Sequence, residues 1–547
     1  MTADTSPGAG SDAASTPRAG AFAPLRNRLF AVLWAATVLG NVGTFMRDVA
    51  SAWLVLDLSG SPGAVALVQA AATLPIFLLA IPAGVLSDIM DRRRMLIAVQ
   101  CALACVSAAL MLLASTGSAT VASIAALTFL GGVGAALMAP SWQAIVPELV
   151  PRSELKGAIA LNSLGFNISR AIGPALGGAI LAGFGAAATY AADVLTYAVV
   201  VASLLWWRRE PATRDALSEE FTGALKAGLR FARASRDTHR VLLRAGLFFA
   251  CASALWALLP VVAGPMLGGG PGFYGLLLAS VGAGAVGGAV LLPKLRGRLS
   301  PDGILLAGSV VTAALMAVLS LAPPRWAAVP ILLVQGAAWI AVLTTLNATM
   351  QGILPNWVRG RGLALYLTVF NGAMTAGSLA WGGLAEAAGV PATLCAGAAG
   401  LLAVALAVRG RPLPAGEADL APSNHWPEPL LAAPVRGDRG PVLITVEYRI
   451  HEGDRPGFLA VLGRLSEERR RDGAYAWGVS EDASDPQRIV EWFFVESWFE
   501  HLRQHRRVSH ADADVQAEVL AFHRSAQPPA VTHFLAVDRG DPAGPPP

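Results

Sequence analysis

Long apolar stretches separated by short polar connections occupy residues 25–410 of the chain. A helix needs roughly 20 apolar residues to span a hydrocarbon core of about 30 Å, so each stretch predicts one membrane-spanning helix. The pattern predicts twelve of them, at 29–56, 62–86, 95–115, 119–145, 157–183, 187–207, 241–264, 271–292, 303–322, 326–351, 361–386 and 391–408. The composition agrees, since 54% of the 547 residues are apolar and only 14% are charged.

Basic residues gather in alternate connections of this pattern. With a cytoplasmic N-terminus, Arg325 is the one basic residue predicted in an outer loop. The inner loops hold Arg92, Arg93, Arg94, Arg152, Lys156, Arg208, Arg209, Lys294, Arg296, Arg298, Arg359, Arg361 and Arg409. The positive-inside rule then places both termini in the cytoplasm and the protein in a plasma or inner membrane.

An internal repeat divides the apolar region into two parts. Residues 143–150 (QAIVPELV) match residues 351–358 (QGILPNWV). We therefore expect two pseudo-symmetric six-helix halves at 25–207 and 241–410, with a binding site between them. The connection at 208–240 is predicted to hold an amphipathic helix on the inner membrane face, and residues 1–24 to be disordered.

The C-terminal part of the chain has the pattern of a soluble domain. Residues 411–440 are typical of a linker, 441–538 of a folded domain and 539–547 of a disordered tail. Strands are predicted at 442–450, 474–480, 488–495 and 531–537, with helices at 455–471 and 497–522. The order β-α-β-β-α-β predicts a ferredoxin-like domain.

The connection after the second predicted span carries a candidate gate. Its residues are Gly84, Asp88, Arg92, Arg93 and Arg94. Gly84 permits close helix packing, and Asp88 can meet the positive N-terminal end of a neighbouring helix. The loop resembles the signature loop of the major facilitator superfamily, with Ile89 and Asp91 as departures; the alternative is a loop that only fixes topology.

The fifth predicted span carries a glycine-rich motif, formed by Ser169, Gly173, Pro174, Gly177 and Gly178. Pro174 removes a backbone hydrogen bond and the glycines allow close approach, so we expect a kinked, tightly packed element. The segment resembles the antiporter motif of exporters in the superfamily, with Ala160 and Ser169 where glycines are usual. Export is thus favoured over uptake, although simple helix packing explains the same residues.

Residues 140–151 and 162–178, with Asn41, Trp53 and Ser61-Pro62, resemble the enterobactin-exporter-like branch of the superfamily. The resemblance implies a secondary active transporter that exports a siderophore, drug or secondary metabolite by alternating access, with a proton as the coupling ion. The arginine often found in the fourth span of proton-coupled drug exporters is absent from residues 127–134.

Ionisable residues inside spans are costly and are candidates for coupling or substrate binding by default. They are Arg47, Asp48, Arg170 and Asp193, and Asn41, Asn167 and Asn371 join them as predicted cavity residues. At about 1.5 Å per residue, Arg170 and Asp193 lie at similar depths, so we predict that they pair. Such a pair is either a proton switch or a purely structural brace.

The tail domain, especially residues 471–477 and 496–505, resembles the antibiotic-biosynthesis-monooxygenase-like domains, which implies dimerisation through its sheet. His501 and His505 share a helix face, where solvent exposure is favoured over a metal site. The sequence shows no nucleophile-base arrangement and no Walker A motif, and it predicts neither an enzyme nor a cofactor, metal or nucleic-acid site. The alternative is a membrane-anchored enzyme or ligand-sensing module acting through the tail domain.

Overall fold

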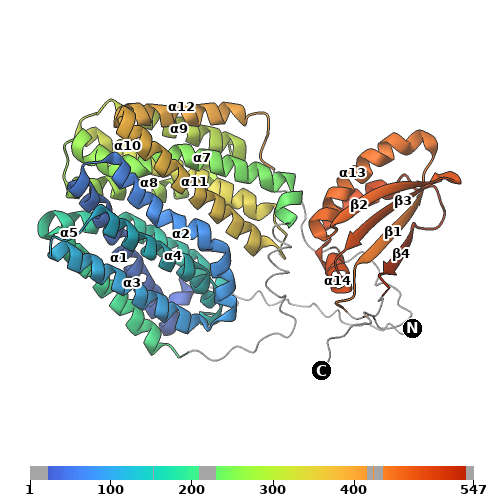
Figure 1. Cartoon of the computed structure of the whole chain (residues 1–547), viewed down its shortest axis with the longest axis horizontal. Helices are drawn as coiled ribbons and strands as arrows, with labels where there is room; N and C mark the ends of the chain where they lie inside the picture. The colour runs from blue at the N-terminus through green and yellow to red at the C-terminus, as the bar shows by residue number, and fades with distance from the viewer. Residues whose placement is uncertain are drawn as a thin grey trace, which may run out of the picture.

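The computed structural model describes residues 22–151, 153–208, 230–355, 357–414, 423, 435 and 437–537, apart from the side chains of Val85, Ser87, Asp88, Ile89 and Ala144. A helical body and a smaller α+β domain lie side by side (Figure 1). The predicted disordered ends, the linker, and the amphipathic helix of the inter-half connection fall largely or wholly outside the described residues.

The body consists of long apolar helices whose bounds lie within a few residues of the predicted spans. They are α1 (Arg28–Ser59), α2 (Pro62–Ile89), α3 (Arg92–Ser115), α4 (Val121–Leu149), α5 (Leu155–Trp206), α7 (Arg236–Val261), α8 (Pro271–Arg296), α9 (Pro301–Ser320), α10 (Arg325–Gly352), α11 (Arg359–Ala388) and α12 (Val390–Ala407). Within the described ranges, these eleven are long and apolar enough to cross a membrane. The chain is thus a multi-pass helical membrane protein.

Helix α5 contains two of the predicted spans. Its 52 residues would reach about 78 Å at 1.5 Å each, more than twice a hydrocarbon core of about 30 Å. The backbone turns at Gly185, which has a φ of 82° that a residue without Cβ adopts freely. Helix α1 runs parallel to the first arm, because successive residues of α1 contact successive residues of that arm up to Gly177. It runs antiparallel to the second arm, because Thr44 contacts Tyr197 whereas the later Ser51 contacts the earlier Tyr190.

Helices α2 and α5 of the predicted first half pack closely against α11 and α8 of the predicted second half. A Cβ added to Gly382 of α11 would overlap Cβ of Ala66 in α2. Glu386 accepts hydrogen bonds from Ser61 Oγ at 2.9 Å and Gly63 N at 3.0 Å, which places a carboxylate on the positive N-terminal end of α2. This contact joins the halves at the membrane side remote from the tail domain, where α11 ends (Figure 1).

The tail domain is a four-stranded antiparallel sheet with helices on one face. The strands β1 (Val442–Arg449), β2 (Ala476–Asp482), β3 (Asp485–Val495) and β4 (Ala530–Leu535) pair in the order β2-β3-β1-β4. The helices are α13 (Arg455–Asp472), α14 (Trp498–Arg507) and α15 (His510–Leu520). The predicted helix at 497–522 is therefore two, because Ser509 caps α15 with a reciprocal capping box to Asp512.

Under α13, the fully buried Glu491 of β3 lies in the apolar core of this domain. It accepts hydrogen bonds from Arg469 Nε at 3.2 Å, Trp477 Nε1 at 3.0 Å and the Tyr448 hydroxyl at 3.1 Å. A buried carboxylate is tolerated when its oxygens are bonded in this way. The three donors come from α13, β2 and β1, so Glu491 fixes the helix against the sheet.

Candidate functional site

Charged side chains meet inside the first half, between α1 and the second arm of α5. The Arg47 guanidinium lies 3.8 Å from Asp193 Oδ2 and donates to the Tyr197 hydroxyl at 2.9 Å. Ser107 of α3 donates to the same Asp193 oxygen at 2.6 Å. Asp193 is 0% exposed, so its charge is compensated by Arg47 and by hydroxyl donors instead of by water.

Helical spacing explains why these groups meet. Thr44, Arg47 and Ser51 follow one another at i, i+3 and i+7 on α1, the spacing of one helix face. They face Tyr197, Asp193 and Tyr190 of α5, respectively. The α5 residues share one helix face as well, and they run in the opposite direction because the two helices are antiparallel. Gly43 lets the helices approach, because a Cβ there would overlap Thr196 Oγ1 and lie 2.5 Å from Asp193 Oδ1.

A second carboxylate completes the cluster. Asp48 Oδ1 lies 3.4 Å from Arg47 Nη2, and its side chain is 48% exposed. The cluster of Arg47, Asp48 and Asp193 thus has two carboxylates and one guanidinium. Its formal charge is −1 with both acids ionised, and one proton makes it neutral. A group of this composition inside a membrane can take up and release a proton.

The predicted pair between Arg170 and Asp193 is wrong. Asp193 faces Arg47, whereas Arg170 on the first arm of α5 stacks over the Phe166 ring at 5.2 Å. The Arg170 carbonyl and the adjacent Ala171 lie against Gly282 of α8, which puts this part of α5 on the boundary between the halves. The two residues lie on different arms of α5 and face different helices, so similar depth in the membrane does not bring them together.

The three candidate asparagines lie on separate helices. Asn167 of α5 and Asn371 of α11 each donate to the carbonyl four residues earlier, at 2.8 Å from Ser163 O and Leu367 O. Asn371 is buried, while Asn41 on α1 and Asn167 are partly exposed. Their grouping around one substrate cavity stays a prediction.

The candidate gate of the first half is tied to the ends of three helices. Arg92 donates to Glu148 of α4 at 2.7 Å, and Arg93 donates to the Leu204 and Leu205 carbonyls at the end of α5. Asp91, one departure from the family pattern, caps α3 by accepting from Arg94 N at 2.8 Å. Gly84 lies within α2, and the Asp88 side chain lies outside the described residues.

The antiporter-like motif lies where α1, α5 and α8 meet. A Cβ on Gly173 or Gly177 would lie 2.6 Å or 2.7 Å from atoms of α1, and a Cβ on Gly178 would lie 2.8 Å from Gly275 Cα of α8. Ser169, where a glycine is usual, donates to Val38 O at 2.9 Å and so adds a bond to α1. The α-helix continues through Pro174, and the turn comes at Gly185 instead.

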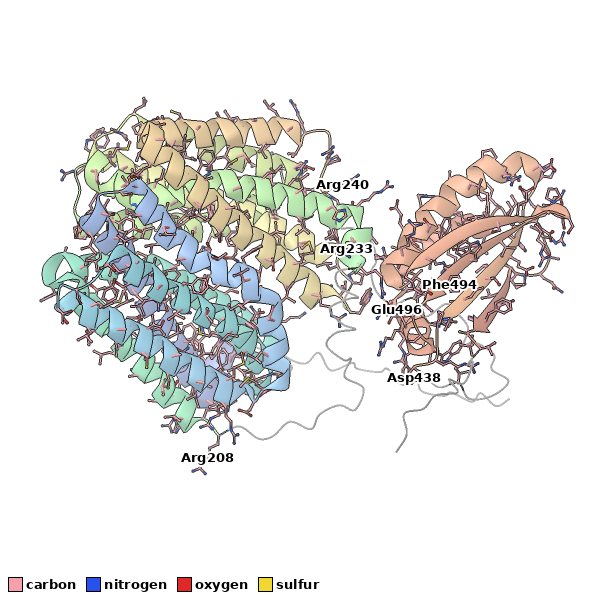
Figure 2. All side chains as sticks on the ribbon, viewed as in Figure 1. Arg208, Arg233, Arg240, Asp438, Phe494 and Glu496 are labelled. Carbon is pink, nitrogen blue, oxygen red and sulfur yellow. The ribbon has the colours of Figure 1, made fainter. Side chains whose placement is uncertain are left out.

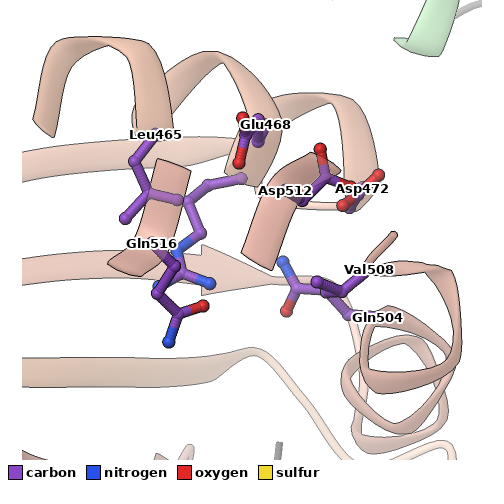
Figure 3. Close-up of a pocket in the computed structure, with 8 residues that line it drawn as sticks. Leu465, Glu468, Asp472, Gln504, Val508, Asp512 and Gln516 are labelled. Atoms are coloured by element: carbon purple, nitrogen blue, oxygen red, sulfur yellow. The ribbon is translucent and has the colours of Figure 1, made fainter. Parts of the chain in front are cut away.

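A polar hollow in the tail domain, which the sequence did not predict, lies between α13, α14 and α15 (Figure 3). It is lined by Leu465, Glu468, Arg469, Asp472, Gln504, Val508, Asp512 and Gln516. Gln504 is fully buried, and Glu468 Oε2 has no hydrogen-bond partner in the part of the chain that the structure describes. The enclosed space is only about 10 Å³, far below the roughly 300–1,000 Å³ of most small-molecule sites.

Burial in this hollow shifts the titration of two carboxyls. Desolvation, followed by the charges of Asp512 and Asp472, raises the pKa of Glu468 to about 8. Desolvation also raises the pKa of Asp472 to about 6, against the lowering effect of Arg471. Glu468 therefore changes charge near neutral pH.

The favoured interpretation of His501 as a solvent-exposed residue is wrong. His501 is 2% exposed and lies between Trp498, His505 and His533, with its Nε2 at 3.2 Å from His505 Nε2. Desolvation and the neighbouring histidines lower its pKa to about 3. Across the described ranges, no three His, Cys, Asp or Glu side chains form a group that could hold a metal ion.

The helical body defines the class as multi-pass helical membrane proteins. The chain is similar in fold to the nucleoside transporter NupG (TM-score 0.57, 11% identity, 70% of this chain and 98% of that chain). A bacterial homologue of the lysosomal transporter Spinster, in an inward-facing unoccupied conformation, has a TM-score of 0.55 at 15% identity and covers 70% of this chain and 94% of its own.

The chain belongs to the transmembrane secretion effector family of major facilitator transporters, which it matches over residues 19–541. The match includes the tail domain. The multidrug efflux pump Tap of Mycolicibacterium fortuitum is 26% identical over 383 residues, which cover 68% of this chain and 92% of Tap. The staphyloferrin A transporter of Staphylococcus aureus is 26% identical over 257 residues, 46% of this chain and 64% of that protein.

The Arg47–Asp193 contact predicts a non-additive effect on stability. Arg47→Met alone leaves a buried carboxylate without its cation and should cost about 3–5 kcal/mol. The double variant Arg47→Met/Asp193→Asn should recover most of this loss, because no isolated charge remains. Thermal unfolding in detergent of the four members of the cycle measures the coupling. Arg170→Met is the matched control, expected within about 1 kcal/mol of the parent, and additive losses at 47 and 193 would contradict the pairing.

Glu468 predicts a pH-dependent stability of the tail domain. Its folded pKa lies above its unfolded value, so the stability it contributes is fully present below pH 4.5 and is lost as pH rises through about 8. Glu468→Gln stays uncharged and should unfold at a higher temperature than the parent, by a margin that grows between pH 6.5 and 8.5. Subtracting parent from variant melting temperatures at each pH cancels the other titrating groups. A margin that is constant with pH would rule out this role for Glu468.

Proposed function

We propose that the protein is a proton-coupled exporter of a small molecule (siderophore, drug or secondary metabolite) that works by alternating access of two pseudo-symmetric six-helix halves. The observation that carries the proposal is the cluster of Arg47, Asp48 and Asp193, with two acids for one base inside the first half. Asp48 is about half exposed and is proposed to connect the cluster to a water-filled cavity, while Asp193 holds the buried end.

Export as the direction rests on two supports. The antiporter-like motif, whose resemblance favours export, packs α5 against both α1 and α8, and it is proposed to transmit a movement of α1 to the boundary between the halves. The relatives named above include a multidrug efflux pump, and a macrolide efflux protein of Streptococcus pyogenes is 23% identical over 266 residues.

Arg170 is our candidate for substrate contact. Its guanidinium lies over Phe166, and Phe166 packs edge-on against Phe45 of α1 at 5.8 Å, so a cation and two aromatic rings adjoin the boundary between the halves. This surface suits an amphipathic substrate with aromatic or anionic groups. Asn41, Asn167 and Asn371 are proposed to supply hydrogen bonds from α1, α5 and α11.

The basic loops favour a cytoplasmic location for the tail domain and both termini under the positive-inside rule. With that orientation, the Glu386 contact closes the halves at the outer side, as expected for an inward-facing state. Asp88 and the Arg92 to Arg94 cluster are proposed to form the inner gate, which acts on the opposite side from Glu386.

The tail domain is proposed to be ferredoxin-like and to dimerise through the sheet face that carries no helices. The strand order β2-β3-β1-β4 supports the fold assignment. Paired positions on the free face carry Leu443, Trp492, Phe494 and Phe534, and Tyr475 packs beside Phe494. Phe534 and Tyr475 are about half exposed. The small hollow beside Gln504 gives no support to the alternative of a membrane-anchored enzyme.

Transport is tested in proteoliposomes loaded with ethidium, a macrolide or staphyloferrin A under an imposed pH gradient. At least one compound should be moved in a gradient-dependent manner. Asp48→Asn and Asp193→Asn should each lower gradient-driven transport at least about tenfold, because neutral cluster members cannot release a proton. Exchange of labelled for unlabelled substrate without a gradient should survive. No movement of any compound would count against export, and gradient-driven transport in both variants would remove the cluster from coupling.

Dimerisation is tested by light scattering of the purified chain in detergent. The parent should have the mass of two chains, and Tyr475→Asp/Phe534→Asp should have the mass of one, because charges on the face oppose apolar contact. Leu520→Asp, on a half-exposed position of α15 on the helical side, is the matched control and should remain dimeric. A monomeric parent would refute the assignment.

A further inference from the structure

In the described part of the chain, the tail domain contacts the body just before and in α7 and between α10 and α11, on the side of the second half. Arg230 and Phe231 lie in a helical turn before α7, Arg236 lies in α7, and Trp357 lies between α10 and α11. Figure 2 shows Arg233 and Arg240 on the body facing the side of the tail domain that carries Glu496. The charges are complementary, with arginines before and in α7 opposite acids on the tail.

The centre of this contact is an ion pair and two cation–aromatic stacks. Arg230 donates to Glu500 of α14 at 2.5 Å and lies 4.0 Å from Glu496. Phe231 and Trp357 pack edge-on at 5.8 Å. Arg507 lies over the Trp357 ring at 4.3 Å and Arg471 over the Phe231 ring at 5.8 Å.

The same arginines are fixed inside the tail domain. Arg507 donates to Glu500 at 2.7 Å and to the Asp472 carbonyl at the end of α13 at 3.0 Å. Arg471 donates to Asp512 of α15 at 2.5 Å. Their guanidinium planes are therefore held in position for Phe231 and Trp357, and the contact needs little further ordering of side chains.

The two halves brace the equivalent connection differently. In the first half, Glu148 in the last turn of α4 pairs with Arg92 at the start of α3. In the repeat, Asn356 stands in the sequence where Glu148 stands, and the second-half region Gly288–Lys294 has no acid that corresponds to Asp88. Trp357 occupies the position of Leu149, which is 3% exposed in the core of its own half. Trp357 packs partly against the core of the body and also lies under Arg507 of the tail domain.

We propose that the tail domain is a docked brace of the second half, and that its grip on Phe231 and Trp357 replaces the ion pair that steadies the matching connection in the first half. The brace moves with the second half through the transport cycle. The brace requires only that the chain is a transporter, and it depends on neither proton coupling nor the direction of transport.

Docking is tested by cross-linking in the full chain, with Cys101, Cys105, Cys251 and Cys395 replaced by serine. Arg236 and Glu467 form an exposed ion pair at 2.8 Å between α7 and α13. Arg236→Cys/Glu467→Cys should react efficiently with a short bismaleimide. The control is Arg236→Cys/Arg455→Cys. Arg455 lies twelve residues, or about 18 Å, from Glu467 along α13, so this pair should react poorly. Equal yields for the two pairs would overturn docking.

The brace is tested by hydrogen exchange, which needs no transported substrate. Arg230→Glu opposes Glu500 and Glu496 and should lower the cross-link yield several-fold. It should also speed amide exchange several-fold at residues 357–362 and leave residues 149–155 unchanged. Arg230→Lys, which keeps the charge, should behave as the parent. The matched first-half variant Glu148→Gln should speed exchange at residues 149–155 and leave 357–362 unchanged.

Two results would overturn the brace. One is loss of the cross-link in Arg230→Glu with unchanged exchange at residues 357–362, which would show docking without bracing. The other is faster exchange of both connections in every variant, which would show a general loss of stability. The cross-link yield and the hydrogen exchange can be measured even if the liposome assays detect no transport. The brace and the proposed export function can therefore fail independently of each other.

Discussion

Hydrocarbon offers no hydrogen bonds, and this constraint governs where polar residues lie in the body. Each buried polar group of a span must find its partner on a neighbouring helix or in its own turn. The contacts of Thr44, Arg47 and Ser51 with the second arm of α5 meet that demand for two helices at once. Gly43 and Gly177 bring the same helices close, since a Cβ at either position would lie within 3 Å of α5 or α1. Packing and the proposed coupling thus share one interface.

Hydropathy alone predicted the spans of the body to within a few residues, because lipid imposes length and polarity on each helix separately. The turn at Gly185 falls between two predicted spans for the same reason. Hydropathy does not predict which face of each helix points to which neighbour, because that rotation depends on the packing of other helices. Similar depth therefore suggests a pair between Arg170 and Asp193, whereas the close approach at Gly43 turns the face of α1 that carries Arg47 toward Asp193.

In the tail domain, strand alternation and turn residues predicted the order of elements, but not what the helices cover. His501 and His505 share a helix face as predicted, yet His501 is buried because β4 brings His533 against it from a distant part of the chain. The hollow at Glu468 and Gln504 likewise collects residues from three helices. Sites built from distant segments leave no local pattern in a single sequence.

The repeat also shows how one sequence can support two halves of unequal composition. The first half keeps Arg92 and Glu148 within its own helices, so its loop is steadied by an ion pair that needs no further chain. The second half has Trp357, which is partly buried against the core of the body and is covered further by Arg507 of the tail domain. A domain fused to the C-terminus lies at high effective concentration beside that loop, so even modest contacts keep it docked. With the proposed brace, the asymmetry of the repeat and the presence of the tail domain have one physical explanation.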